Sequence, residues 1–181
     1  MRVWQRNVLT GGLIGLWLAG LAWAFWWFEG RYVKAFDRPA FFQGVAVTPP
    51  FPTGAVQVVH VWRSGCPCNA GHQDYVNEMS ERFAAQGVRF ARAGLADDPG
   101  LSGVLKDLPY WSIPEEWAGW PGAPAVAIWD ATGHLAYVGP YSDGAHCNSD
   151  SSFIEPVLVA LLQGRSVDIT RQDTVSCLCD L

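Results

Sequence analysis

The sequence carries little positive charge. Its 12 lysine and arginine residues are outnumbered by 17 aspartate and glutamate residues, which gives a formal net charge of −5 at pH 7. Proteins that bind nucleic acid need a basic face to neutralise phosphates, and no cluster of basic residues provides one here. We therefore expect no nucleic acid among the partners. The chain also contains no internal repeat and no low-complexity tract, so one globular domain is the default for its 181 residues.

Charge is absent altogether from residues 8–28. At roughly 1.5 Å for each residue, a helix of this length spans about 30 Å, the thickness of a bilayer core. Trp23, Trp26 and Trp27 lie at its far end, where amphipathic rings favour the membrane interface. We predict a transmembrane anchor, preceded by a cytoplasmic tail of residues 1–7. A signal peptide is the alternative, because the sequence Ala-Trp-Ala at 22–24 fits a small-x-small cleavage site.

The next segment, residues 29–54, is rich in proline, glycine and aromatic residues and shows no sustained period. This composition predicts a linker with at most one short strand near residues 45–47. Basic residues occur on both sides of the anchor, so they do not decide its orientation. Five cysteines behind an export-like segment favour an oxidising compartment for the domain that follows.

Apolar and β-branched runs predict the elements of that domain. Residues 55–62 have the length of a buried strand, and residues 88–95 form a second one. Between them, His72, Val76, Met79 and Phe83 recur at helical spacing, which predicts a helix that begins near residues 66–69 and ends by Gly87. Strand, helix and strand in this order indicate a βαβ unit with parallel strands. Further elements are expected at 101–108 (helix), 125–129 and 134–138 (hairpin) and 153–163 (helix).

Two stretches resemble the thioredoxin family. The sequence VVHVWRSGCPC at 58–68 resembles the strand and active-site loop of thioredoxins, and GAPAVAIWD at 122–130 resembles the segment whose cis-proline faces that loop. The chain looks most like the membrane-anchored, thioredoxin-like proteins of Gram-negative bacteria that face the periplasm. This resemblance implies a thioredoxin-like α/β domain over residues 55–164, with a central mixed sheet flanked by helices, and a cysteine-containing tail at 165–181. It also implies a single-pass protein of the inner membrane with its C-terminal domain in the periplasm.

The resemblance further implies a thiol:disulfide oxidoreductase or isomerase that acts on protein thiols or on a redox partner protein and uses no cofactor. Cys66, at the start of a helix, takes the place of the nucleophile, and Cys68 that of the resolving thiol. His60 stands where thioredoxins have a buried acid, and imidazole can accept a proton in its place. The residues expected to bind substrate are Trp62, Pro67, Ala123 and Pro124.

The chain departs from the family in the spacing of these cysteines, which is Cys-x-Cys where thioredoxins have Cys-x-x-Cys. Residues i and i+2 have Cα atoms about 5.5 to 7 Å apart, at the edge of disulfide geometry. A bond from Cys66 to Cys68 would close a small and strained ring, which predicts a labile disulfide with an oxidising or isomerising character.

Two other functions fit the same residues. Cys66, Cys68 and His72 offer the thiolate and imidazole ligands that suit copper(I), so a copper-handling module is one alternative. The other is a non-catalytic interaction domain in which Trp111, Trp117 and Trp120 grip a partner, although these rings would equally serve to cover the core. His60 and His72 likewise have a simple alternative as packed core residues.

Three further cysteines lie downstream, Cys147 and the tail pair Cys177 and Cys179. A chain end is poorly ordered unless it is tied down, and a structural disulfide from Cys147 to Cys177 or Cys179 would tie it. The competing hypothesis is a relay in which the Cys-x-Cys of the tail exchanges electrons with Cys66 and Cys68.

Overall fold

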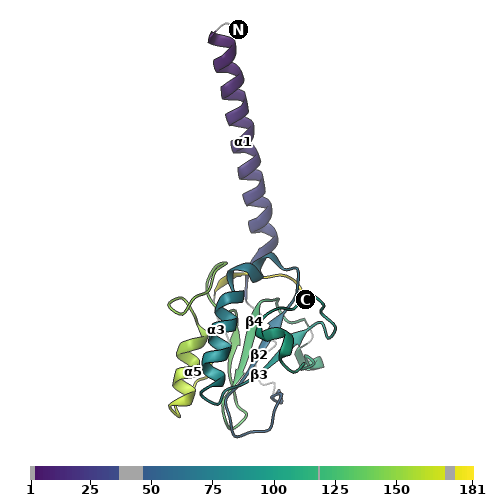
Figure 1. Cartoon of the computed structure of the whole chain (residues 1–181), viewed down its shortest axis with the longest axis vertical. Helices are drawn as coiled ribbons and strands as arrows, with labels where there is room; N and C mark the ends of the chain where they lie inside the picture. The colour runs from purple at the N-terminus through teal and green to yellow at the C-terminus, as the bar shows by residue number, and fades with distance from the viewer. Residues whose placement is uncertain (1–2, 37–46, 118, 170–173) are drawn as a thin grey trace.

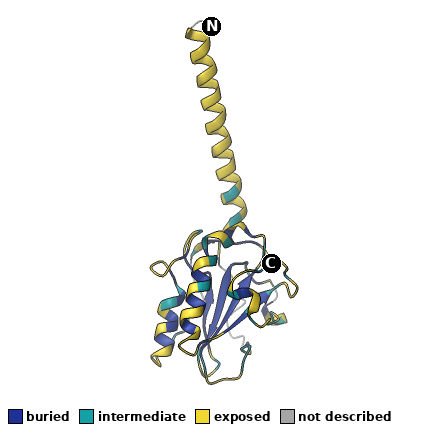
Figure 2. Ribbon diagram, viewed as in Figure 1, coloured by how far each residue is buried: buried dark blue, intermediate teal, exposed yellow. Residues whose placement is uncertain are grey.

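A long helix extends from a folded domain in the computed structural model, which describes residues 3–36, 47–117, 119–169 and 174–181 (Figure 1). The helix, α1 (Val3–Tyr32), contains no buried residue and is yellow along most of its length in Figure 2. It contains the predicted span of residues 8–28 and is longer than that span. By length and composition, α1 is able to cross a membrane.

The centre of the domain is a four-stranded sheet in the order β3-β2-β4-β5. Strand β2 (Gln57–Trp62) runs parallel to β3 (Arg89–Gly94) and antiparallel to β4 (Ala125–Trp129). The hairpin partner of β4 is β5 (Leu135–Gly139). The runs that predict strands form them, with ends that differ by one or two residues. Every residue of β2, β4 and β5 is buried, because both faces of the sheet are covered.

Two helices, α3 (Gln73–Ala84) and α5 (Ile154–Leu162), cover one face of the sheet (Figure 1). The predicted apolar side of α3 is confirmed, since Val76, Met79 and Phe83 are buried in the core cluster that also holds Leu158 of α5. A 3-10 turn, η1 (Pro67–Gly71), leads into α3. The helix predicted at 101–108 is shorter, α4 (Val104–Asp107), because Gly103 adopts a positive φ of 59° before it and Pro109 follows it.

The opposite face of the sheet is covered by tryptophans. Trp117, in the 3-10 turn η2 (Glu115–Trp117), stacks on Trp129 of β4, and Trp111 and Trp120 pack against it. Only 1% of Trp117 and 7% of Trp120 is exposed. These rings belong to the cluster of buried apolar side chains on this face of the sheet, which we call the second core. The hypothesis that they form an exposed grip is therefore wrong for Trp117 and Trp120, because both side chains are buried in this core.

A second, two-stranded sheet joins the two ends of the domain. Strand β1 (Val33–Ala35), directly after α1, pairs antiparallel with β6 (Val175–Cys177) in the tail. The segment predicted as a linker, residues 29–54, thus begins with the last turn of α1 followed by a paired strand. The strand expected near residues 45–47 falls largely outside the described residues. Beyond β6, the Leu178 amide donates to the Tyr32 carbonyl at 2.7 Å. The C terminus therefore lies beside the base of α1, at the same end of the sheet as the start of α3 (Figure 1).

This topology is the thioredoxin-like α/β fold that the resemblance implies. A parallel βαβ unit, an antiparallel hairpin and a final helix follow one another around one mixed sheet. The peptide bond between Ala123 and Pro124 is cis, as expected for the proline that faces the active-site loop.

Candidate functional site

Cys66 lies where the chain passes from β2 to the first helical turn. Gly65 before it has a φ of 76°, a left-handed conformation that suits glycine, and the Ser64 amide donates to Asp98 Oδ2 at 2.8 Å. Cys66 itself is extended and occupies the N-cap of η1, with Pro67 at the first helical position. The sequence therefore places this cysteine at the start of a helical segment, as predicted.

Both cysteines of the loop are bonded to the tail. Cys66 forms a disulfide with Cys179, and Cys68 forms one with Cys177; the Cα atoms are 6.0 Å and 5.5 Å apart. The expected bond between Cys66 and Cys68 is not formed, so its small ring, and the oxidising character argued from it, do not apply. Instead the tail lies along the loop and offers each sulfur its own partner.

Cys147 is not bonded to the tail, and the prediction of a disulfide to Cys177 or Cys179 is wrong. All five cysteines lie in the described residues, and Cys147 is the free one. Its Sγ lies in the main core, 3.6 Å from the Tyr141 carbonyl oxygen, and burial raises the pKa of its thiol to about 11. Pairing of β6 with β1 directs the tail cysteines toward the loop, into a separate cluster with Cys66 and Cys68.

The tail also occupies the strand position beside the cis-proline. The Ala123 amide donates to the Cys179 carbonyl at 2.9 Å, and the Cys179 amide donates to the Ala123 carbonyl at 2.7 Å. These two bonds make an antiparallel bridge between the residues. Cys66 Sγ lies 3.6 Å from the Ala123 carbonyl oxygen. The position that the resemblance assigns to a bound substrate is therefore taken by the chain's own C-terminal segment.

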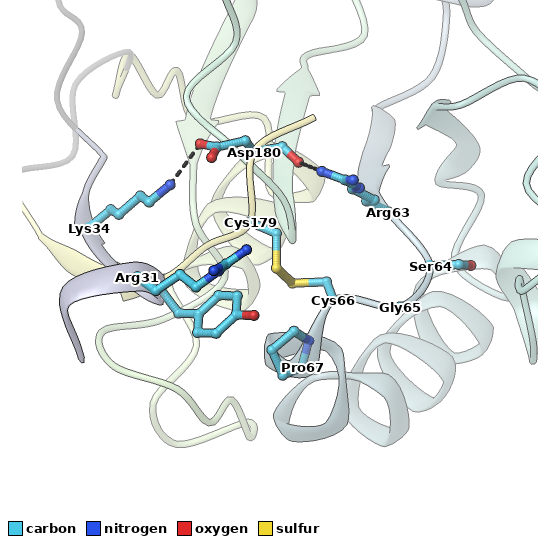
Figure 3. Close-up of a pocket in the computed structure, with 10 residues that line it drawn as sticks. Arg31, Lys34, Arg63, Ser64, Gly65, Cys66, Pro67, Cys179 and Asp180 are labelled. Atoms are coloured by element: carbon cyan, nitrogen blue, oxygen red, sulfur yellow. Dashed lines mark hydrogen bonds and ion pairs between the residues drawn. A yellow bond between two sulfur atoms is a disulfide. The ribbon is translucent and has the colours of Figure 1, made fainter. Parts of the chain in front are cut away.

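A basic pocket of about 190 Å³ opens beside the Cys66–Cys179 disulfide (Figure 3). Its cations come from three places: Arg31 lies in the last turn of α1, Lys34 lies in β1, and Arg63 follows β2. The Lys34 ammonium binds Asp180 Oδ1 at 2.7 Å, and Arg63 Nη1 donates to the Asp180 carbonyl oxygen. Hydrogen bonding to Lys34 and its charge, with smaller contributions from Arg63 and Arg31, lower the pKa of the Asp180 carboxyl.

The two disulfides differ in their access to this pocket. Cys66, Cys179 and Pro67 line it, whereas Cys68 and Cys177 do not. The exposed fractions follow the same order, 7% and 8% for Cys66 and Cys179 against 2% and 1% for Cys68 and Cys177. We call Cys66–Cys179 the outer disulfide and Cys68–Cys177 the inner disulfide. A thiol arriving from solvent can reach the outer one first.

His60 lies on the same face of β2 as Trp62, as the alternation predicts, but both its ring nitrogens are engaged elsewhere. Nδ1 is 2.5 Å from the Tyr141 hydroxyl and Nε2 is 3.0 Å from the Ser80 hydroxyl. Complete burial lowers its pKa to about 3. Within the described residues no hydrogen bond joins His60 to a sulfur, and a packed core histidine accounts for these contacts. Trp62 is likewise buried, with its ring edge-on to Tyr141.

His72 is held by a backbone contact. Its Nδ1 donates to the Cys68 carbonyl at 2.9 Å, and the ring is buried. Among the described residues, the side chains grouped closely enough to hold one metal ion are Cys66, Cys68 and Cys179, whose sulfurs all lie within 4.8 Å of one another. The tail sulfur thus stands where the sequence suggested an imidazole.

The sequence interpretation offered contact between the tail cysteines and Cys66 and Cys68 only as the competing relay, and it missed the cations around the outer disulfide. A signal for this contact was present, since Cys66-Pro67-Cys68 and Cys177-Leu178-Cys179 have the same spacing. The cations carried no such signal, because Arg31 and Lys34 are brought to the site by the pairing of β1 with β6.

Solved structures with a similar fold come from several bacteria. An uncharacterized conserved protein from Geobacillus kaustophilus has 20% sequence identity and a TM-score of 0.54, over 83% of this chain and 90% of that one. A hypothetical protein from Sinorhizobium meliloti 1021 has 14% identity and a TM-score of 0.51, over 81% and 88%. A putative thiol:disulfide interchange protein DsbE from Chlorobium tepidum has 18% identity and a TM-score of 0.45, over 61% and 82%.

Sequence comparison identifies the family. No curated protein matches the chain. Residues 38–181 match the family model described as Domain of unknown function (DUF6436), and the chain belongs to this family.

Proposed function

We propose that the protein is a thiol:disulfide oxidoreductase that acts on protein thiols through the outer disulfide. The observation that carries this proposal is the position of Cys66, which caps a helical segment, borders a solvent-open basic pocket and lies beside the cis-proline. The free amide groups at a helix start and nearby cations both stabilise a thiolate, the form in which cysteine attacks. Arg31, Lys34 and Arg63 supply those cations.

Exchange at this site needs no cofactor. A partner thiolate attacks Cys66 Sγ and breaks the bond to Cys179, which leaves as a thiolate and takes up a proton. A second partner thiol then attacks the mixed disulfide and releases Cys66. The partner loses two electrons and two protons and forms one disulfide, while Cys66 and Cys179 become thiols. In the reverse direction, Cys179 is the resolving thiol, a role that the sequence assigned to Cys68.

The inner disulfide serves as the fixed attachment of the tail. Because Cys68 and Cys177 do not line the pocket, the inner bond persists while the outer one opens. Backbone bonds reinforce it: Cys177 donates to the Gly144 carbonyl and Gly144 donates to the Val175 carbonyl, each at 2.9 Å. Cys179 therefore stays close to Cys66 through a reaction cycle.

The site belongs at a membrane surface. Phe28 and Tyr32, at the end of α1, pack against the sulfur cluster. If residues 8–28 span the bilayer, the outer disulfide lies within about one helical turn of its boundary. We assign the protein to the bacterial inner membrane with its domain in the periplasm, where disulfides persist. Its partners are protein thiols that reach this surface.

The test is the refolding of reduced, denatured ribonuclease by the full-length protein in detergent. Cys66→Ser should abolish the acceleration that the wild type gives, whereas the matched control Cys147→Ser should keep it, because Cys147 lies in the core away from the pocket. Cys68→Ser should retain part of the activity, since it leaves the outer disulfide intact. A Cys66→Ser protein as active as the wild type would refute the proposal.

Copper handling is a second candidate, favoured by the grouping of the Cys66, Cys68 and Cys179 sulfurs. Only the reduced protein has the free thiolates that a soft ion such as copper(I) prefers. Titration of the reduced protein with copper(I) should then show one tight site that Cys66→Ser weakens and His72→Gln leaves unchanged. A titration that is unaffected by Cys66→Ser would exclude this candidate.

A further inference from the structure

The last residues of the chain fill a groove that has two walls of different chemistry. On one side the backbone of Ala123 pairs with Cys179, a contact that any extended peptide is able to make. On the other side the Lys34 ammonium pairs with the Asp180 carboxylate, and Arg63 donates to the Asp180 backbone carbonyl oxygen. Of these direct contacts, the one from Lys34 is specific for an acidic side chain, whereas the contacts of Ala123 and Arg63 are made to backbone that any residue offers.

Leu178 is the last residue of the tail that the core and the inner disulfide keep in place. Its side chain is fully buried in the second core, and its amide is bonded to Tyr32. The inner disulfide secures the preceding residue, Cys177. By contrast, Asp180 and Leu181 are exposed. Once the outer disulfide opens, the segment that can leave the groove is residues 179–181, and little apolar area is lost when it does.

Departure of this segment leaves a charge imbalance. Lys34 is the cation with a direct ion pair to Asp180, and Arg31 and Arg63 also stabilise its carboxylate. Without Asp180, three cations would line the pocket beside the reactive sulfur. An incoming chain restores the balance if it carries a negative charge at the corresponding position.

We propose that the C-terminal segment 179–181 occupies the site that a partner protein binds. The partner is an extended protein segment with a cysteine thiol, and this cysteine is followed directly by an acidic residue. This inference rests on the proposed function and specifies its substrate class. The partner cysteine takes the place of Cys179 on Cys66, its backbone pairs with Ala123, and the acidic side chain takes the place of Asp180 on Lys34.

The exchange balances without another reagent. The partner thiolate forms a bond to Cys66 Sγ as the bond between Cys66 and Cys179 breaks, and the electron pair of that bond goes to Cys179. The released Cys179 thiolate is stabilised by Lys34 and Arg63 and takes up one proton. Because Cys177 remains bonded to Cys68, Cys179 is ready to attack the mixed disulfide and return the tail to the groove.

The experiment compares two synthetic peptides with the sequence of residues 179–181, acetylated at the N terminus, because residues up to 178 of the protein stay in place; each peptide has one thiol. One keeps the aspartate that corresponds to Asp180, and the other carries Asp180→Asn. Each is mixed with the oxidised full-length protein in detergent, quenched with acid, and assayed by mass spectrometry for the mixed disulfide on Cys66. We expect the aspartate peptide to react about two- to fivefold faster at low salt, the range of one exposed ion pair, and the difference to shrink at 1 M salt.

Charge variants locate the effect. Lys34→Gln should remove the preference for the aspartate peptide, and Arg63→Gln should reduce it. Lys106→Gln is the matched control, because Lys106 is exposed on α4, does not line the pocket, and should preserve the preference. If both peptides modify Cys66 at the same rate, the inference on substrate class is overturned while the proposed function stands. If neither peptide forms a mixed disulfide with Cys66, both fail.

Discussion

The two disulfides join the same two segments of the chain, and this arrangement predicts strongly non-additive effects on stability. Cys66 and Cys179 are 113 residues apart, and Cys68 and Cys177 are 109 residues apart. Either bond alone brings the tail to the loop. The second bond then closes only the small ring made by residues 66–68 and 177–179.

Chain entropy gives the magnitudes. A cross-link that closes a loop of about 110 residues stabilises the folded state by about 5 kcal/mol, whereas one that closes a ring of about six residues contributes about 2 kcal/mol. Removing either disulfide should therefore lower the free energy of unfolding by about 2 kcal/mol. Removing both should cost about 7 kcal/mol, well above the sum of about 4 kcal/mol for the two single removals.

The assay is urea unfolding of the full-length protein in detergent, followed by tryptophan fluorescence under non-reducing conditions. Three variants are compared with the wild type, each with paired cysteines replaced by alanine: the outer pair Cys66 and Cys179, the inner pair Cys68 and Cys177, and all four. Cys147→Ala is the control, since it removes a buried thiol without opening a ring. A quadruple variant that is unfolded without urea agrees with the expectation, because a loss of about 7 kcal/mol is comparable with the stability of many domains.

Additivity would refute this reasoning. If the quadruple variant lost no more free energy than the two pairs added together, the disulfides would not act as parallel links across one long loop. A loss of about 5 kcal/mol from one pair alone would do the same, because it would mean that the remaining bond no longer holds the tail.

Three further predictions concern the core. Because burial raises the pKa of Cys147 to about 11, iodoacetamide at pH 8 should leave it unmodified in the folded protein and alkylate it in urea, as mass spectrometry would show. Burial lowers the pKa of His60 from 6.5 to about 3. Between these pH values the His60 side chain is protonated in the unfolded chain and neutral in the folded protein. The free energy of unfolding should therefore fall as the pH drops through this window, by up to about 1.4 kcal/mol per pH unit. Acid titration of unfolding should show a flatter slope for His60→Gln than for the exposed control His134→Gln. A methyl group on Gly94 would meet the Trp62 carbonyl oxygen at 2.1 Å, whereas one on Gly87 meets open space, so Gly94→Ala should lower the melting temperature more than Gly87→Ala.

The fold was predictable because its evidence is local in the sequence. The β-branched run before Cys66, the helical spacing of Val76, Met79 and Phe83, and the hairpin around Gly133 each specify one element. Their order along the chain, with the matches around Cys66 and Pro124, carried the resemblance to thioredoxins, and the resemblance implied their arrangement around one mixed sheet. The shorter form of α4 was not predicted, although Gly103 and Pro109 bound it locally. The sequence left open whether Trp117 covers the core or grips a partner, because its burial depends on contacts with distant parts of the chain.

Of the candidate site, the position of Cys66 could be predicted in the same way, but the disulfide pairing could not. Cys66 at a helix start follows from the loop sequence, but disulfide partners cannot be deduced from cysteine positions alone. The assignment of Cys147 as the partner of the tail assumed that a free end needs one structural bond to the domain. The pairing of β1 with β6 already ties that end, and it directs the tail away from Cys147.

The spacing of the cysteines explains why the tail fits the loop. In an extended strand, residues two apart face the same side, so Cys177 and Cys179 share one face while Leu178 points into the second core. A Cys-x-Cys loop offers two sulfurs at nearly the same interval, and the Cα separations of 6.0 Å and 5.5 Å show that the two segments run side by side. The pairing of the first loop cysteine with the second tail cysteine is the order that antiparallel segments require. Because it is one residue shorter than a Cys-x-x-Cys motif, this loop matches the spacing of a strand, and the disulfide partner of Cys66 is found 113 residues away instead of within its own helical turn.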